Sequence, residues 1–172
     1  MDVNGLTLRE LQAGDEAAFL AGVASWRGEE LEWHSFHWKP GMAFAELLEI
    51  LRKQRLGLDL APGRVPASML YGFVDSSIVG RVSIRHDLND FLRKIGGHMG
   101  YAVAPAYRRR GYATTMARLG LDACRAVGLR RILVTADDSN ASSWRIIEKL
   151  GGILENIIEL EGALKRRYWI DL

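Results

Sequence analysis

The stretch from Gly97 to Ala117, which reads GHMGYAVAPAYRRRGYATTMA, constrains the fold of this 172-residue chain more than any other. Its first part, Met99–Val103, alternates larger and smaller residues and ends shortly before a proline, which predicts a short strand. From Tyr112 onward, apolar residues recur at steps of three or four, which predicts one face of a helix. A basic turn, Arg108–Gly111, joins the two elements. The stretch therefore predicts a strand that runs through a tight turn into a helix.

This turn has the properties of an anion-binding site. The first backbone N–H groups of a helix lack intrahelical partners, and the helix dipole adds partial positive charge there. Because Gly111 has no side chain and Ala113 has a small one, an anionic group can approach the main chain closely. The sequence predicts a phosphate cradle at the start of this helix.

The hexapeptide Arg108–Ala113, RRRGYA, resembles the R/Q-x-x-G-x-G/A signature of the GCN5-related N-acetyltransferases, the GNAT superfamily. A second segment, Asp138–Gly151, resembles the other coenzyme-facing strand and helix of that family, with its "EKxG" ending. The resemblance covers roughly Leu6–Leu172 and is strongest over Arg81–Asn156, where the chain is similar to a bacterial acetyltransferase subgroup. It implies that acetyl-coenzyme A is the cosubstrate.

Length and periodicity predict a single α/β (α+β) domain over residues 1–172. Strands are expected at Leu6–Leu11, Ser68–Val74, Ile78–Ile84, Met99–Val103, Arg131–Thr135, Asn156–Leu160 and Lys165–Leu172. Helices are expected from Asp15 to Val23 and at Met42–Leu56, Tyr112–Val127 and Ser142–Leu150. The resemblance implies the GNAT fold, a mixed, mostly antiparallel sheet of about seven strands flanked by about four helices. In that fold the two central strands, here Met99–Val103 and Arg131–Thr135, splay apart.

Composition argues against some classes of binding partner. The 23 basic and 21 acidic residues leave a formal net charge of +2, which is too small to indicate nucleic acid as a partner. No apolar run approaches the ~20 residues of a membrane span, and the start MDVNGLTLRE lacks a signal peptide's apolar stretch. Cys124 is the only cysteine, and a small buried hydrophobe is favoured over a nucleophile there. We therefore expect a cytoplasmic protein without nucleic-acid or membrane partners.

The resemblance assigns coenzyme binding to three segments. Ala102 and Val103 would pair through their backbone with the pantetheine arm in the gap between the splayed strands. Asn140 would hydrogen-bond the pantetheine or the neighbouring chain, with Ser143 beside it. The pyrophosphate would lie on the turn and the helix start, formed by Arg108, Arg109, Arg110, Gly111, Tyr112, Ala113 and Thr114.

Acetylation of an amine requires that protons move. An alkyl amine has a pKa near ~10, so a base or a water path must remove a proton before attack. His98 stands where many relatives carry a glutamate, in the pattern E-I-G-Y, and is the candidate base. The alternatives are that His98 packs at the end of a strand, or that it binds substrate without moving a proton. The departing thiolate needs an acid, and the usual tyrosine is replaced by Ile147, which leaves Ser143 and Tyr101 as candidates.

Two segments are candidates for the acceptor side. Aromatic and histidine residues crowd the stretch from 26 to 38, where Trp33 and His34 are candidate acceptor contacts; sealing the core or a homodimer contact is the alternative. His34 and His37 have no third ligand nearby in sequence, so no metal is expected. The polar segment after the third strand supplies three further candidates, and a solvated loop is the alternative there: Arg85, His86 and Asn89.

The sequence thus favours an enzyme that transfers acetyl from acetyl-coenzyme A to a primary amine, by direct attack in a ternary complex. A small molecule and a protein N-terminus both remain open as acceptor. The alternative is a coenzyme A-binding sensor or an inactive homologue, because the usual tyrosine is missing.

Overall fold

The computed structural model describes residues 5–26 and 30–172. Within this part of the chain the strands are β1 Thr7–Arg9, β2 Ala67–Val74, β3 Ser77–Arg85, β4 Met99–Val103, β5 Arg131–Asp137, β6 Ile153–Leu160 and β7 Ala163–Asp171. The helices are α1 Glu16–Ser25, α2 Phe44–Leu56, α3 Asp90–Lys94, α4 Tyr112–Ala126 and α5 Ala141–Lys149, with 3₁₀ turns at Ala13–Asp15, Leu31–Trp33 and Pro105–Tyr107. None of these helices is long and apolar enough to cross a membrane.

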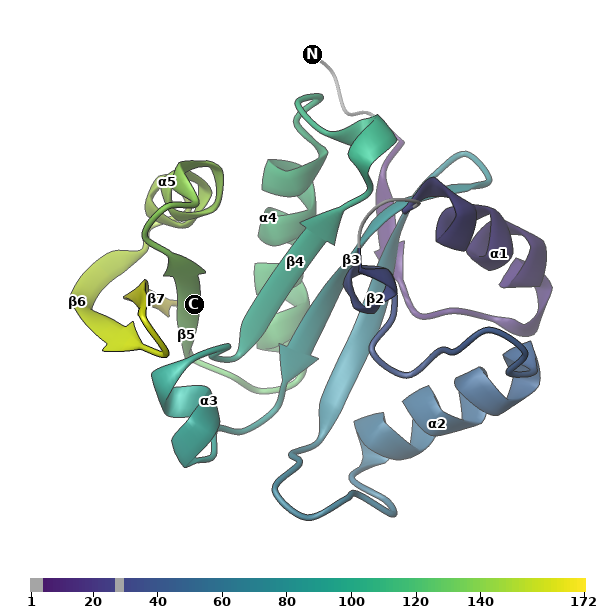
Figure 1. Ribbon diagram of the computed structural model, residues 1–172, viewed down its shortest axis with the longest axis horizontal. Coiled ribbons are helices and arrows are strands. Elements are labelled where there is room, and N and C mark those ends of the chain that lie inside the picture. The colour runs from purple at the N-terminus through teal and green to yellow at the C-terminus, as the bar shows by residue number, and fades with distance from the viewer. Residues whose placement is uncertain (1–4, 27–29) are drawn as a thin grey trace.

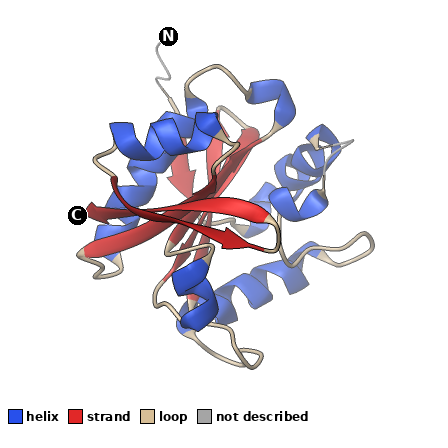
Figure 2. Ribbon diagram, turned by 60° about the vertical axis from the view of Figure 1, so that its left-hand side comes forward, coloured by secondary structure: helices blue, strands red, loops and turns tan. Residues whose placement is uncertain are grey.

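The strands form two antiparallel sheets that meet at β4 and β5. One sheet has the order β1-β2-β3-β4 and the other has the order β5-β7-β6. β4 and β5 run in the same direction and diverge toward their carboxyl ends (Figure 1). Turned by 60°, the molecule shows its strands at the centre with helices around them (Figure 2). The expected GNAT fold, with seven strands and splayed central strands, is confirmed.

The two sheets are joined at the narrow end of the gap by a pair of hydrogen bonds. The backbone N–H of His98 donates to the carbonyl of Leu133 (2.7 Å), and the N–H of Leu133 donates to Nδ1 of His98 (2.9 Å). Gly97 precedes this joint with φ +58°, and a Cβ built on it would lie 2.2 Å from the Leu133 oxygen. A residue without a side chain is therefore required for β4 to approach β5 here.

Helix α4 packs on the face of the first sheet that carries Val82 and Met99. Two glycines bring the layers together: a Cβ at Gly120 would lie 2.7 Å from the Met99 sulfur and 3.1 Å from Val82 Cγ1, and one at Gly72 would lie 2.9 Å from the Met116 sulfur. The buried residues of this cluster continue across the gap into β5, β7 and α5. One core therefore supports both sheets.

A second core fills the space between the opposite face of β2 and the helices α1 and α2, which lie together on the right in Figure 1. Phe19 and Leu47 are fully buried there against Tyr71 and Phe73. The Phe19 ring meets the Tyr71 ring edge-on at 6.0 Å, a favourable aromatic geometry. These helices therefore stay fixed to the sheet through aromatic packing.

The sequence-based segments agree with the structure where periodicity is strong. β4 has the expected bounds, and α2 and α5 lie within one or two residues of theirs. The structure has a fifth helix, α3, which was missed because five residues are too few to show a period. It begins after Asn89, whose side chain accepts a hydrogen bond from the N–H of Leu92 (2.8 Å). This N-cap was not recognised because it lies in a polar segment without a period. β6 begins at Ile153, earlier than expected.

The joint between the sheets can be tested with Gly97→Ala, for which Gly128→Ala is the matched control. Both glycines have positive φ, but a Cβ at Gly128 would meet nothing within 4 Å. The control therefore carries only the backbone cost, about 1–2 kcal/mol. Gly97→Ala adds an overlap with backbone, and we expect its loss in free energy of unfolding to be larger by about 1–3 kcal/mol. Denaturant unfolding measures both, and equal losses would contradict the joint.

Candidate active site

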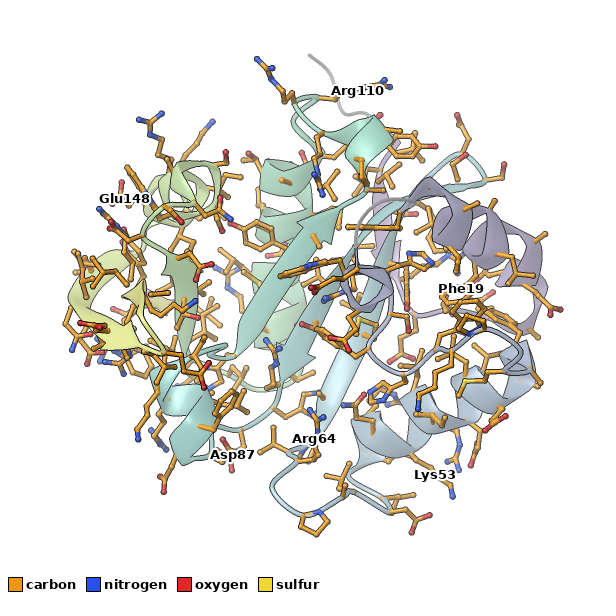
Figure 3. The ribbon with its side chains drawn as sticks, viewed as in Figure 1. Phe19, Lys53, Arg64, Asp87, Arg110 and Glu148 are labelled. Carbon is orange, nitrogen blue, oxygen red and sulfur yellow. The ribbon has the colours of Figure 1, made fainter. Side chains whose placement is uncertain are left out.

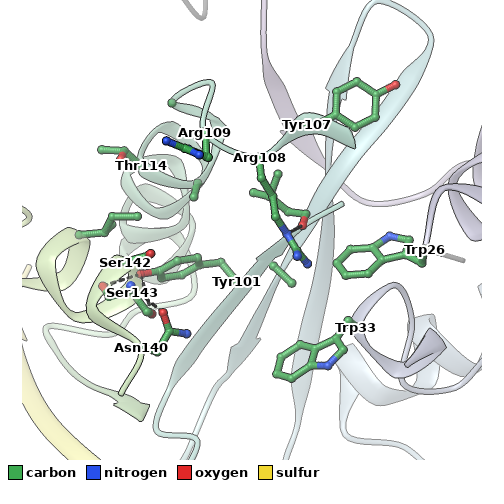
Figure 4. Close-up of a pocket in the computed structure, with 15 residues that line it drawn as sticks. Trp26, Trp33, Tyr101, Tyr107, Arg108, Arg109, Thr114, Asn140, Ser142 and Ser143 are labelled. Atoms are coloured by element: carbon green, nitrogen blue, oxygen red, sulfur yellow. Dashed lines mark hydrogen bonds between the residues drawn. The ribbon is translucent and has the colours of Figure 1, made fainter. Parts of the chain in front are cut away.

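A cleft of about 610 Å³ opens where β4 and β5 diverge. Figure 4 shows it between the end of β4, the start of α4, the start of α5 and the two indoles of Trp26 and Trp33. It is lined by Trp26, Trp33, Tyr101, Ala102, Val103, Tyr107, Arg108, Arg109, Gly111, Ala113, Thr114, Asn140, Ser142, Ser143 and Ile146. The cleft thus brings together all three segments that the sequence assigned to the coenzyme.

The start of α4 forms one wall of the cleft. Gly111 is the N-cap, with φ +87°, and Arg109 before it has φ +60°. The first bond of the helix runs from Thr115 N–H to the Gly111 oxygen (3.2 Å), and Gly111 has no side chain to cap the earlier N–H groups. The first turn therefore presents backbone N–H groups and the positive end of the helix dipole, which suits a phosphate.

The three arginines of this turn differ in position. Arg108 points inward between the walls of the cleft, where its Nε donates to the Val103 oxygen (3.0 Å) at the end of β4. Arg109 lines the cleft. Arg110 is exposed and does not line it; its guanidinium lies 5.9 Å from the Tyr107 ring. Tyr112 also lies outside the lining and contacts the Tyr107 ring. Of the expected coenzyme residues, only Arg110 and Tyr112 are not part of the lining.

Two hydroxyl groups meet across the cleft. The Tyr101 hydroxyl from β4 lies 3.2 Å from Ser143 Oγ and donates to the Ser143 carbonyl (3.1 Å) at the start of α5. Asn140 holds this helix start in place, since its Oδ1 accepts the Ser143 N–H (3.1 Å). Burial raises the pKa of Tyr101, and the bond to Ser143 only partly opposes it. The phenol is therefore protonated at neutral pH and can serve as a proton donor.

His98 does not have the geometry of a base, which corrects the sequence-based expectation. Its ring is 8% exposed, and Nδ1 already accepts the Leu133 N–H, so the neutral ring carries its proton on Nε2. Burial lowers the pKa of His98. The residue lines neither the cleft nor the second cavity beside it. Its position supports the alternative reading, in which His98 packs at the end of the strand.

The acceptor-side candidates separate into three groups. Trp33 lines the cleft, whereas His34 is 1% exposed in the core, where its ring packs on Phe19 and Tyr71. His34 is therefore a core residue and not a pocket residue, because its Nε2 is directed to the Phe19 carbonyl (3.2 Å). Arg85 and Asn89 line a second cavity. His86 stands beside that cavity, with Nε2 2.9 Å from the hydroxyl of Ser68 in its wall.

The cleft also has lining residues that the sequence did not single out: Trp26, Tyr107, Ser142 and Ile146. Ser142 and Ile146 are one helical turn apart on α5, so the helical period of that segment carried a signal for them. Trp26 is 1% exposed and belongs to the aromatic stretch from 26 to 38 that the sequence assigned to the acceptor side, where Trp26 itself was not named as a contact. Only the tertiary fold brings it against the strand β4.

Within residues 5–26 and 30–172, no three histidine, cysteine, aspartate or glutamate side chains are grouped to hold a metal ion. Cys124 belongs to α4 and is fully buried in the core. Burial raises the pKa of its thiol to about 12. This thiol is therefore neither ionised at neutral pH nor accessible to a substrate.

A family model described as an acetyltransferase (GNAT) domain matches residues 5–153. The chain belongs to the GNAT acetyltransferase family. A search of curated protein sequences found no match.

Solved structures of acetyltransferases share the fold of this GNAT chain. A chimera of the Vibrio cholerae spermidine N-acetyltransferase and hSSAT is 21% identical, with a TM-score of 0.62 over 98% of this chain and 96% of that one. The ribosomal-protein-S5-alanine acetyltransferase of Vibrio fischeri is 17% identical, with a TM-score of 0.66 over 99% and 95%. A Salmonella typhimurium protein assigned as an acetyltransferase, solved with its cofactor acetyl-CoA, is 16% identical, with a TM-score of 0.62 over 98% and 95%.

The buried His34 predicts that acid destabilises the GNAT domain. Burial lowers its pKa from 6.5 to about 4, so the unfolded chain binds more protons between these values. Above pH 6.5 the neutral His34 ring does not lower the free energy of unfolding. As pH falls from 6.5 toward 4, the free energy of unfolding decreases by a total on the order of 3 kcal/mol. Chemical denaturation at a series of pH values should show a shallower pH slope for His34→Gln than for the unaltered chain. Because slopes are compared, a uniform loss of stability does not matter, and identical slopes would refute the assignment.

Proposed function

We propose that this protein transfers an acetyl group from acetyl-coenzyme A to a primary amine, by direct attack in a ternary complex. The observation that carries the proposal is the single cleft formed by β4, the turn before α4 and the start of α5. These segments are far apart in sequence, yet their predicted coenzyme residues surround one space of about 610 Å³. The similar Salmonella structure, solved with acetyl-CoA, supports the same cosubstrate.

The cleft fits the two ends of the coenzyme by different means. The N–H groups at the start of α4 suit the pyrophosphate, because they combine unpaired donors with a positive dipole end. β4 pairs with β3 along one edge only, while β5 pairs with β7. The edge of β4 that faces the gap therefore has backbone groups available for the amides of the pantetheine arm, near Ala102 and Val103.

The residues of the cleft support transfer without a covalent enzyme intermediate. Cys124 is the chain's only thiol, and it is buried with a raised pKa. In the proposed step the amine nitrogen bonds to the thioester carbonyl carbon, the carbon–sulfur bond breaks, and the thiolate takes a proton from Tyr101. Ser143, which is hydrogen-bonded to that phenol, returns the proton from solvent. The amine's own proton leaves through water, since no histidine within the described residues lines the cleft.

The acceptor is proposed as an amine on two grounds. Amines are the acceptors named for two structurally similar enzymes, spermidine in one and a ribosomal-protein alanine in the other. Trp33 adds an indole to the cleft, 48% exposed, which suits the face of a cationic group.

A coenzyme A-binding sensor is the second candidate, and Ile147 favours it. Ile147 stands where many relatives have the catalytic tyrosine, and here it is 1% exposed in the core. Calorimetric binding of acetyl-CoA combined with an assay for free thiol release on an amine panel separates the two functions. Binding with turnover supports the enzyme, binding without turnover supports the sensor, and no binding contradicts both.

The cradle predicts that Gly111→Glu weakens acetyl-CoA binding. A carboxylate at the N-cap would occupy and repel the pyrophosphate position, so we expect a loss of at least about 10-fold in affinity. Because a side chain at φ +87° also strains the turn, Gly111→Ala is the matched control. Calorimetric titration should show a much greater loss for the glutamate. If both variants bind acetyl-CoA as the unaltered protein does, the cradle is misplaced.

Tyr101→Phe should reduce kcat on the order of 10²-fold, while it leaves the Kd for acetyl-CoA nearly unchanged, because a proton donor acts only in the chemical step. Tyr107→Phe is the matched control, since Tyr107 lines the same cleft at a distance from Ser143 (Figure 4). Steady-state kinetics with saturating acetyl-CoA measure both. Equal reductions of kcat by the two substitutions would show that Tyr101 is not the proton donor.

A further inference from the structure

A second cavity of about 330 Å³ lies beside the cleft, and none of the expected coenzyme residues lines it. Its walls come from the ends of β2 and β3, the loop after α2, helix α3 and the segment 32–37. Glu32 lines this cavity and its neighbour Trp33 lines the cleft, so the two spaces are separated by one short segment. The volume is at the lower end of the range for small-molecule sites.

Strand β3 directs polar side chains toward this cavity where a core strand would carry apolar ones. Val82 and Ile84 face α4, so alternation places Arg81, Ser83 and Arg85 on the opposite face. Ser83 and Arg85 line the cavity, although Ser83 is only 3% exposed. Of this row, Arg85 is the charged side chain that lines the cavity, and a buried charge stabilises a fold poorly, so a ligand is the better explanation of Arg85.

The two β3 arginines have different surroundings. Arg81 is satisfied by protein: its Nε donates to the Trp33 oxygen (2.8 Å), Nη2 donates to the Glu32 oxygen (3.3 Å), and its guanidinium lies 3.9 Å from the Phe36 ring centre. Arg81 therefore anchors the segment between the two cavities.

Arg85 has much less protein around its charge. Its Nη1 makes one long hydrogen bond, to the Gly96 oxygen (3.3 Å). Within residues 5–26 and 30–172, no carboxylate forms an ion pair with Arg85 or with Arg64, an exposed residue that also lines the cavity and is labelled in Figure 3. Burial, and secondarily the charge of Arg64, lower the pKa of Arg85. The positive charges of Arg85 and Arg64 repel one another, and an anionic ligand in the cavity would stabilise both.

The position of Arg85 relative to the cleft sets the size of that ligand. A Cβ on Gly100 of β4 would lie 3.3 Å from Arg85 Nη1, so the guanidinium reaches over this strand. Ala102, which lines the cleft, is two residues further along β4, or about 6.6 Å. Glu32 is the one carboxylate among the described lining residues, and it stands next to the cleft. The lining of the cavity therefore offers one carboxylate, Glu32, in the segment next to the cleft, and two guanidinium groups, those of Arg85 and Arg64.

We propose that this second cavity is the acceptor site, and that it takes a small amine that also carries a carboxylate, with Arg85 and Arg64 holding the carboxylate and Glu32 facing the ammonium group. This inference rests on the proposed acetyltransferase function. It places the amine of an amino-acid-sized molecule toward Ala102, where the acetyl group is expected. It also disfavours polyamines, which carry positive charge to both ends of the cavity.

The test uses the α-amino acids as a panel, each compared with its α-amide, in which the carboxylate charge is absent. We expect kcat/KM for the accepted amino acids to exceed that for the matched amides by about 10- to 100-fold, the range of a charge-assisted hydrogen bond. Arg85→Gln should remove this preference, mostly through KM, and Arg85→Lys should restore part of it. Arg118→Gln, an exposed charge removal on α4, is the control and should keep the preference. Thermal stabilisation of the free protein by the same pairs gives a second readout without turnover.

Outcomes that overturn the inference are distinct from those that overturn the proposed function. Preference for amides or for spermidine over the amino acids, no binding of any panel member, or an unchanged preference in Arg85→Gln would each refute the carboxylate site. In all of these cases acetyl-CoA binding remains intact if the proposed function is right. If the unaltered protein does not bind acetyl-CoA at all, the proposed function is refuted instead.

Discussion

The structure depends on one pair of hydrogen bonds between its two sheets, in which His98 and Leu133 each donate one N–H to the other. These bonds hold β4 and β5 together at one end, and the two strands form no ladder of backbone pairs further along, since β4 pairs with β3 and β5 with β7. Right-handed twist then carries two strands of separate sheets apart. An open edge of β4 follows from this geometry, and the cleft follows from the open edge. A continuous ladder between β4 and β5 would have closed the space in which the coenzyme is proposed to lie.

The divergence of the strands is limited at the cleft by a second contact. The bonds of Tyr101 to Ser143 connect β4 to the start of α5 across the gap. The same phenol therefore contacts both sides of the gap and is the proposed proton donor. The start of α5 is fixed in turn by the Asn140 cap, so the two hydroxyls that are proposed to move the proton stand on a strand and a helix and not on a loop.

The features that sequence predicted well are those with a local cause. The strand–turn–helix unit around Gly111 follows from alternation, glycine and helical period, all within twenty-one residues of sequence, and the structure has it with the expected bounds for β4. The places where prediction failed have non-local causes. His98 was read as a base because the sequence does not show that Leu133, thirty-five residues away, donates to it. The sequence left His34 between an acceptor contact and the core, because its contacts with Phe19 and Tyr71 depend on how α1 packs on the sheet.

The same limit explains why the sequence did not show the surroundings of Arg81 and Arg85. Arg85 was a candidate acceptor contact with a solvated position as the alternative, Arg81 was not singled out, and both alternate with apolar residues on β3. In the structure one is capped by two carbonyls and an aromatic ring, and the other retains a single long bond. A buried guanidinium costs free energy unless its donors are satisfied. Arg81 meets that condition with protein groups alone. In the proposed site, Arg85 meets it only when an anion enters the cavity. Its buried charge therefore lowers the stability of the free protein and favours the binding of a carboxylate over a neutral group.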